Sequence, residues 1–166
     1  EALSHGNQQR VQLAAALVHD PVVAVLDEPF SGLDPIGVRA MSHELRRMAA
    51  DGAVIVFSSH QLDLVEDICD DVVIVDQGSV VTSGTLDDLR SRAAQRRLAV
   101  RVDGRAWQPR SVPVQSVGDG TRAHLLVDHT VSIADLLAEA EQDGDVEVFS
   151  FEPPTLTDIF HEAVRR

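Results

Sequence analysis

The chain has 166 residues, of which 44% are hydrophobic, so it carries enough apolar material for a folded core and is not disordered in composition. Its net charge of -13 argues against a nucleic-acid-binding surface, because such surfaces need clustered basic residues that displace counterions. No apolar run reaches the roughly 18 residues that a membrane-spanning helix requires. The single cysteine, Cys69, rules out an intramolecular disulfide and is typical of a reducing compartment.

The first half of the chain alternates strand-like apolar runs with helical patterns. Strands are expected over residues 22–26, 53–57, 72–76 and 79–82, and helices over 4–18, 36–49 and 61–69. The unbroken apolar runs 22–26 and 53–57 favour parallel strands that are buried on both faces. Gln77-Gly78 predicts a hairpin turn, and Pro35 suits the first position of a helix. The alternation as a whole predicts an α/β fold with a parallel sheet.

The composition changes after Gly84. A capping-box pattern that starts at Thr85 predicts a helix to about Ala94. Further strands are expected over residues 98–102, 123–127 and 146–151, and further helices over 132–141 and from 155 onward. Residues 103–121 are rich in Gly, Pro, Ser and Asp and are expected to form a loop with one short strand. We therefore divide the chain into residues 1–84, a linker helix over 85–96, and a small α+β module over 97–166.

Two adjacent carboxylates, Asp27 and Glu28, directly follow the apolar run 22–26. In open α/β sheets the carboxyl edge of the strands is where ligands bind. Neighbouring side chains on a strand point to opposite sides, so one acid can hold magnesium while the other orients an attacking water. The alternative is that the paired acids only cap the following turn, and these two residues alone do not decide between the two interpretations.

The second apolar run ends in Ser58-Ser59-His60, which places an imidazole at the same expected edge of the sheet. A histidine there can donate a hydrogen bond to a phosphate oxygen, although a lone histidine after a strand is more often a turn residue. Ser4 and Gly6 at the start of the first expected helix form a possible anion site, for which an ordinary helix cap is the alternative. The remaining histidines show no spacing typical of a metal site, and no nucleophile-elbow motif is present.

Together these segments resemble the ATPase domain of ABC transporters over residues 1 to about 84. Leu3-Ser4-His5-Gly6-Asn7 is similar to the family signature LSGGQ, with His5 in place of the first glycine and Asn7 in place of the glutamine. Val22 to Glu28 resembles the Walker B strand with its glutamate, and Ser31 to Asp34 resembles the D-loop. His60 lies where the family has its switch histidine. The motifs occur in the family's order and spacing.

The resemblance implies a subunit that works in a head-to-tail dimer of two ABC ATPase subunits, with two ATP molecules between them. Ser4, His5, Gly6 and Asn7 would face the nucleotide held by the partner, with Ser4 and Gly6 on its γ-phosphate. Asp27 would hold Mg²⁺ through water, Glu28 would polarise the attacking water, and His60 would contact the γ-phosphate. The D-loop, including Ser31 and Asp34, would connect the two sites. The expected partner is an integral membrane permease, which implies a cytoplasmic subunit on the inner face of the membrane.

The phosphate loop of this family requires a lysine, and all 14 basic residues of this chain are arginine. We therefore expect a partial P-loop NTPase sheet without its phosphate-loop strand, and a chain that does not bind or hydrolyse ATP alone. In the family that strand lies between the strands corresponding to 53–57 and 72–76, so its removal would leave two unpaired edges. The start at Glu1 is a further reason to expect a fragment of a longer protein.

The tail indicates a subfamily. The segment from Phe151 to Phe160 resembles the closing helix of export-type ATPases, which carry a small C-terminal module and pair with separate permeases. The alternative for Leu156, Ile159 and Phe160 is simple packing of an amphipathic helix. Two other functions stay open at this point: a soluble ABC ATPase of DNA repair or translation, and a truncated, non-catalytic interaction fragment.

Overall fold

The computed structural model describes residues 5–117 and 124–164. The chain forms two compact units that divide between Cys69 and Asp70. This division lies earlier than the boundary near residues 84–96 that the sequence predicts. The difference arises because the hairpin of residues 71–85 pairs with itself and contacts the helices over 86–92 and 156–164. The hairpin is therefore part of the second unit.

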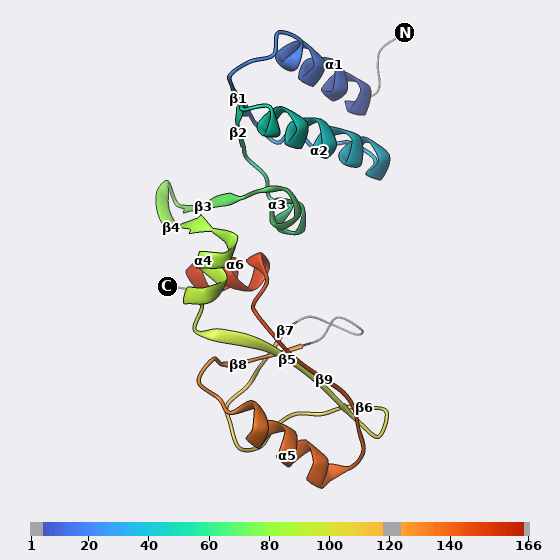
Figure 1. Ribbon diagram of the computed structural model, residues 1–166, viewed down its shortest axis with the longest axis vertical. Helices are drawn as coiled ribbons and strands as arrows, with labels where there is room; N and C mark the ends of the chain where they lie inside the picture. Colours follow the sequence, from blue (N-terminus) through green and yellow to red (C-terminus); the bar gives the residue numbers. More distant parts are fainter. Residues whose placement is uncertain (1–4, 118–123, 165–166) are drawn as a thin grey trace. The chain divides into compact units, whose positions relative to one another are not determined.

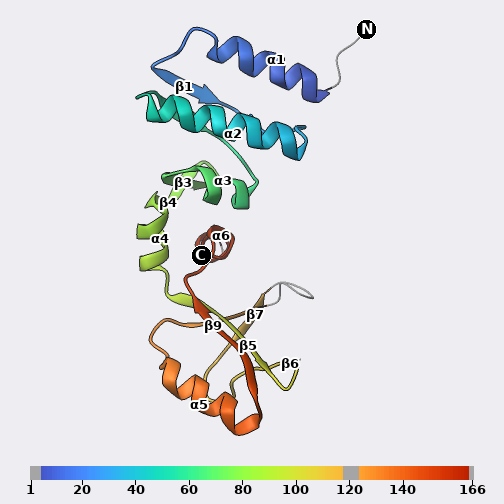
Figure 2. The same cartoon turned by 45° about the vertical axis from the view of Figure 1, so that its right-hand side comes forward.

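The first unit contains three helices and one pair of strands within its described residues. In chain order these are α1 (His5–Leu17), β1 (Val23–Leu26), α2 (Pro35–Ala50), β2 (Val54–Phe57) and α3 (Leu62–Ile68). Strands β1 and β2 are parallel, with Leu26 opposite Phe57. Helices α1 and α2 run alongside each other next to the strands (Figures 1 and 2). The predicted α/β class is therefore confirmed, and the element bounds agree with the predicted ones to within one or two residues.

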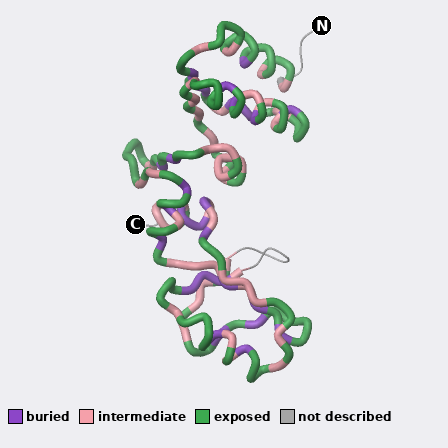
Figure 3. The backbone as a smooth tube through the Cα atoms, in the orientation of Figure 1, coloured by how far each residue is buried: buried purple, intermediate pink, exposed green. Residues whose placement is uncertain are grey.

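Helix α2 begins at Pro35, the residue expected at the first helical position. The Asp34 carboxylate accepts a hydrogen bond from the Gly37 N–H at 2.7 Å, and Pro35 fills the first helical turn, where no N–H is needed. Buried and exposed positions alternate along α2 at helical spacing, as Figure 3 shows. Its buried side, which includes Leu45, faces the core of the unit.

The core of the first unit lies on one side of the strand pair only. The residues buried together there are Leu13 of α1, Leu26 of β1, Phe30 between β1 and α2, and Leu45 of α2. The opposite face of the pair exposes four valines by more than half of their surface: Val23, Val25, Val54 and Val56. The expectation that both strands are buried on both faces is therefore wrong for the described chain. The reason is that helices cover only one face of the strand pair, so more exposed and less exposed residues alternate along each strand.

The second unit opens with an antiparallel hairpin of β3 (Asp71–Asp76) and β4 (Ser79–Thr85). Its turn has Gln77 at φ 46° and Gly78 at φ 78°, the two positive angles that a tight two-residue hairpin turn requires. The predicted hairpin is confirmed, and it continues three residues further than expected. Strand β2 of the first unit pairs with β1 alone, and β3 pairs with β4 alone, within the described residues.

The rest of the second unit is a five-stranded sheet with three helices. The elements are α4 (Leu86–Arg92), β5 (Gln95–Val102), β6 (Arg105–Ala106), β7 (Gln115–Val117), β8 (His124–Asp128), α5 (Ile133–Asp143), β9 (Val146–Glu152) and α6 (Leu156–Val164). The linker helix ends at Arg92, before the predicted residue 94, because Ala93 is extended and Gln95 already pairs in β5. The loop after β5 holds two short strands, β6 and β7, where one was predicted. Strand β5 pairs antiparallel with β6, β8 and β9.

One face of this sheet forms the main core of the second unit. Leu98, Val100 and Val102 alternate along β5 with period two, so all three side chains lie on the same face. They pack with Leu136 of α5, which is 1% exposed, and with the unit's tryptophan, Trp107. The predicted amphipathic helix and alternating strand thus account for this core.

A buried carboxylate, Asp158, fixes the start of α6. Its Oδ2 accepts hydrogen bonds from the Thr155 N–H at 3.0 Å and hydroxyl at 2.8 Å, and its Oδ1 lies 3.2 Å from His124 Nε2. Burial alone raises the pKa of Asp158, but the Thr155 donors and His124 outweigh it and leave that pKa below its usual value. The Arg97 Nε lies 3.7 Å away and favours the charged form as well.

Replacing Asp158 with Asn tests this arrangement. A carboxyl with a lowered pKa stabilises the fold above its unfolded pKa of about 3.9, and this contribution disappears as pH falls through the folded pKa. We expect Asp158→Asn to lower the free energy of unfolding by roughly 1–3 kcal/mol at pH 7 and by less near pH 3. Urea unfolding followed by the fluorescence of Trp107, the only tryptophan, measures both values. The exposed Glu147→Gln is the control, and an equal loss at both pH values would contradict the prediction.

Candidate functional site

The parallel pair brings the two predicted motifs to one edge of the strands. Asp27 and Glu28 follow β1, and His60 follows β2. The Nδ1 atom of His60 lies 2.7 Å from Oε1 of Glu28, although the two residues are 32 positions apart in the sequence. An acid and an imidazole in direct contact at a sheet edge can share or transfer a proton, which an isolated turn residue cannot do.

The two acids have different partners, as expected for neighbouring side chains at the end of a strand. Asp27 Oδ1 accepts a hydrogen bond from the Ser58 hydroxyl at 2.5 Å, whereas Glu28 contacts His60. The same Ser58 oxygen accepts the backbone N–H of Glu28 at 3.0 Å. Ser58 therefore holds both acids in place. Sequence reasoning noted it only as part of the segment before His60, although its position directly after a strand could have indicated it.

Glu28 has an unusual backbone conformation. Its φ is 46°, in a region that non-glycine residues rarely adopt and that costs on the order of 1–3 kcal/mol. Neighbours fix every polar part of the residue except one oxygen: Ser58 binds its N–H, Gln9 Nε2 donates to its carbonyl oxygen at 3.3 Å, and His60 contacts Oε1. The other carboxylate oxygen, Oε2, is buried and has no hydrogen-bond partner among the described residues.

The loop from Glu28 to Asp34 is a tight turn that leads into α2. The Ser31 N–H donates to the Glu28 carbonyl at 3.0 Å, and Gly32 has φ 73°. At its end Asp34 caps α2 and also lies 2.7 Å from Arg10 Nη2 of α1. Ser31 and Asp34, which the sequence assigned to a D-loop, thus lie in the same turn as Glu28. Arg10 and Gln9, which sequence reasoning treated only as the continuation of the signature, contact this turn directly.

The signature-like segment leads into α1. Ser4 lies outside the described residues, and His5 begins the helix without a description of its side chain. A side chain at Gly6 would place its Cβ 2.7 Å from the carbonyl oxygen of Gly32, so only glycine allows this close packing of α1 on the turn. Asn7 is exposed. The structure therefore places Gly6 against the turn and Asn7 at the surface.

The acidic edge suits a lightly coordinated magnesium ion better than a fully caged one. No group of three or more His, Cys, Asp or Glu side chains in residues 5–117 and 124–164 could hold a metal by itself. Magnesium keeps several waters and commonly takes one or two carboxylates together with phosphate oxygens. Asp27 is exposed and anchored through one oxygen by Ser58, which fits a residue that binds the ion through water.

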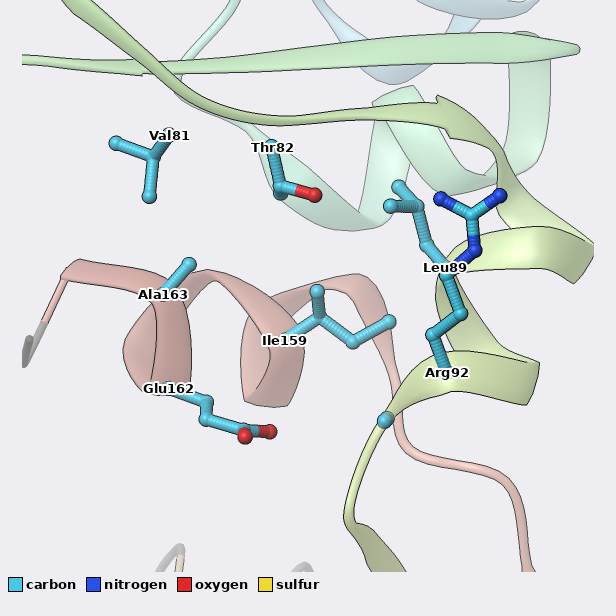
Figure 4. Close-up of a pocket in the computed structure, with 8 residues that line it drawn as sticks. Val81, Thr82, Leu89, Arg92, Ile159, Glu162 and Ala163 are labelled. Atoms are coloured by element: carbon cyan, nitrogen blue, oxygen red, sulfur yellow. The ribbon is translucent and has the colours of Figure 1, made fainter.

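The second unit contains a pocket of different character. It is lined by residues of β4, α4 and α6: Val81, Thr82, Leu89, Arg92, Ala93, Ile159, Glu162 and Ala163. Figure 4 shows Leu89 and Ile159 between the strand and the two helices. The lining is mainly aliphatic and offers no paired acid or nucleophile, so the pocket does not compete with the acidic edge as a catalytic site. Burial of Leu156 and Ile159 confirms that packing accounts for these two tail residues.

No helix in the described part of the chain is long and apolar enough to cross a membrane. This agrees with the lack of a long apolar run in the sequence.

Two protein-family models match the chain. The model described as "ATP-binding protein DrrA1-3-like, C-terminal domain" matches residues 84–164, and the model "ABC transporter" matches residues 1–31. The second match includes the signature-like segment, strand β1 and the two acids that follow it, Asp27 and Glu28. The first begins at Gly84, where the composition of the chain changes.

Curated relatives and a solved structure agree with these models. An uncharacterized ABC transporter ATP-binding protein of Alkalihalophilus pseudofirmus is 34% identical over 99% of this chain and 62% of its own length. The cobalt import ATP-binding protein CbiO of Salmonella typhimurium is 43% identical over 51% of this chain and 31% of its own length. A solved ATP-binding subunit of an ABC transporter is 39% identical, with a TM-score of 0.52, over 54% of this chain and 38% of that one.

The first unit is an α/β unit with a parallel strand pair, an acidic edge and a glycine-dependent helix contact. The family matches then identify the chain as a member of the ABC transporter ATP-binding proteins, with a DrrA-like C-terminal domain. The chain spans about 62% of the length of the first of these relatives. The resemblance inferred from the motifs is confirmed.

Ser58 provides a direct test of the site's geometry. We expect Ser58→Ala to speed hydrogen exchange of the Glu28 amide roughly 5-fold, because a lost hydrogen bond is worth about 1 kcal/mol. Exchange measured by NMR on the chain gives this rate. Ser59→Ala is the matched control, because the Ser59 hydroxyl accepts from the Gln61 N–H and not from Glu28. Equal Glu28 exchange in the two variants would show that Ser58 does not hold this amide.

Proposed function

We propose that these residues belong to the ATP-hydrolysing subunit of an ABC transporter, in which they supply the water-activating side of the site. The contact between Glu28 and His60 at 2.7 Å, beside Asp27, carries the proposal. ATP hydrolysis needs a group that orients water and a group that stabilises charge on the γ-phosphate. An acid and an imidazole in contact at the ligand-binding edge of a sheet meet both needs.

Each residue of the edge receives a role in this proposal. Glu28 takes a proton from the attacking water in this role. His60 contacts Glu28 Oε1 through Nδ1, and in its imidazolium form it also donates toward phosphate from Nε2. Asp27 holds Mg²⁺ through water, and the ion neutralises phosphate charge when bound.

The signature segment and the turn complete a two-subunit arrangement. Ser4, His5, Gly6 and Asn7 face ATP held by a second ABC ATPase subunit, and Ser31 and Asp34 lie between the two sites. The second subunit binds head to tail, and an integral membrane permease couples the pair to transport at the inner face of the membrane. The names of the relatives support transport over a soluble role in repair or translation.

Export is the direction that we infer for this transporter. Its support is the tail from Phe151 to Phe160 together with the match of residues 84–164 to the DrrA-like domain. The similarity to a cobalt importer covers only 51% of the chain, so the ATPase motifs alone do not fix direction. Accumulation of a substrate in cells that requires the intact transporter would contradict export.

Replacing Glu28 with Gln in the longer protein that contains this chain tests catalysis. We expect kcat for magnesium-dependent ATP hydrolysis to fall roughly 10²–10⁴-fold, because the variant keeps the shape but loses the base. ATP binding should be retained. Glu141→Gln, an exposed change on α5, is the isosteric control. Activity of the Glu28 variant equal to that of this control would overturn the role of Glu28.

The 166-residue chain alone should not bind ATP. It contains no lysine, so it cannot form the phosphate loop that neutralises the β- and γ-phosphates in this family. Isothermal titration of the chain with magnesium and ATP should give no saturable heat at millimolar nucleotide, whereas the longer protein should bind. Micromolar affinity of the chain alone would contradict this prediction.

A further inference from the structure

Two side chains of α1 contact the turn that carries Glu28 and Asp34. Gln9 Nε2 donates to the Glu28 carbonyl oxygen at 3.3 Å, and Arg10 Nη2 lies 2.7 Å from Asp34 Oδ1. Both belong to the helix that begins in the signature-like segment. The helix expected to face the partner's nucleotide is therefore in direct contact with the turn expected to act on the chain's own nucleotide.

The Arg10 contact depends on a glycine in α2. A Cβ atom at Gly37 would lie 2.7 Å from Arg10 Nη2 and 2.8 Å from Asp34 Oδ1. Asp34 Oδ1 also accepts the Gly37 N–H at 2.7 Å, so one oxygen joins the start of α2 to the guanidinium of α1. Glycine in a helix costs up to about 1 kcal/mol relative to alanine. The chain has this less favourable residue at a place where a methyl group would displace Arg10.

The ion pair itself contributes little to stability. The side chains of Arg10 and Asp34 are 47% and 59% exposed, and exposed ion pairs contribute about 1 kcal/mol at most. The ion pair matters more for geometry than for stability, because it fixes the distance between α1 and the turn. Because the contact contributes little to the stability of the unit, a substitution can break it without unfolding the unit. Its effect on activity can therefore be measured on a folded protein.

We propose that Gln9 and Arg10 are positioning residues that couple the two nucleotide sites of the dimer within one chain. Contact of the signature segment with the partner's nucleotide shifts α1, and these two side chains pass the shift to the Glu28 carbonyl and to Asp34. This inference rests on the proposed function. It adds a coupling within one chain, through α1, to the coupling between the two sites that the D-loop is proposed to provide.

The test uses the longer protein and compares Arg10→Ala, Arg10→Lys and Gly37→Ala with Arg39→Ala. Arg39 is an exposed arginine on α2 and serves as the matched control. We expect Arg10→Ala and Gly37→Ala to lower kcat roughly 5-fold or more and to lower the Hill coefficient for ATP, with Tm unchanged. Arg10→Lys should retain most of both, since it restores the charge. The double variant should be no worse than Arg10→Ala, because Gly37→Ala acts by displacing the same guanidinium.

Several outcomes would overturn the coupling. These are wild-type behaviour of Arg10→Ala, additive effects in the double variant, a loss of kcat that follows a drop in Tm, or a wild-type protein without cooperativity. The proposed function has a separate readout. If wild-type hydrolysis depends on Glu28 while Arg10→Ala matches Arg39→Ala, only the coupling fails; if no Glu28-dependent hydrolysis exists, the proposed function fails.

Discussion

The parallel pairing of β1 with β2 determines what the first unit can do. Leu26 lies opposite Phe57, and the ladder continues for one more bond, from the Ser58 N–H to the Leu26 carbonyl at 3.0 Å. This register sets Ser58 beside Asp27 and brings His60 to Glu28. A slip by one residue would turn every side chain of one strand to the other face, so the acid and the imidazole could not meet. The chemistry of the edge is thus a consequence of strand register.

The same pairing explains the uneven burial of the unit. Helices α1 and α2 cover the face of Leu26, while Val23, Val25 and Val54 remain exposed on the other face. Apolar burial stabilises at about 25 cal/mol per Å², so the described first unit draws its stability from one side of the strands. An exposed valine face of this kind is suited to further packing. The second unit differs, because its β5 has α5 over its apolar face and three strand partners.

Local patterns predicted the elements well because local physics forms them. The Asp34-Pro35 start of α2, the Gln77-Gly78 turn and the period-two apolar residues of β5 are decided by neighbours in the chain. The exposure of one face of β1 was not predictable, since a continuous apolar run does not reveal what covers it. The residues Gln9, Arg10 and Ser58 were missed for a related reason. Their partners lie 19, 24 and 31 positions away, and nothing local marks such contacts.

Glu28 shows why these distant contacts matter for the site. A positive φ directly before Pro29 is costly, and the local hydrogen bond from the Ser31 N–H to the Glu28 carbonyl does not engage the amide or the carboxylate. Its offset comes from Ser58 on the amide, Gln9 on the carbonyl and His60 on the carboxylate, which reach it from β2 and α1. A residue held on three sides has few alternative conformations, so its one unpartnered oxygen has a defined position. In the proposed role of catalytic base, such a group would lose little entropy when it orients a water.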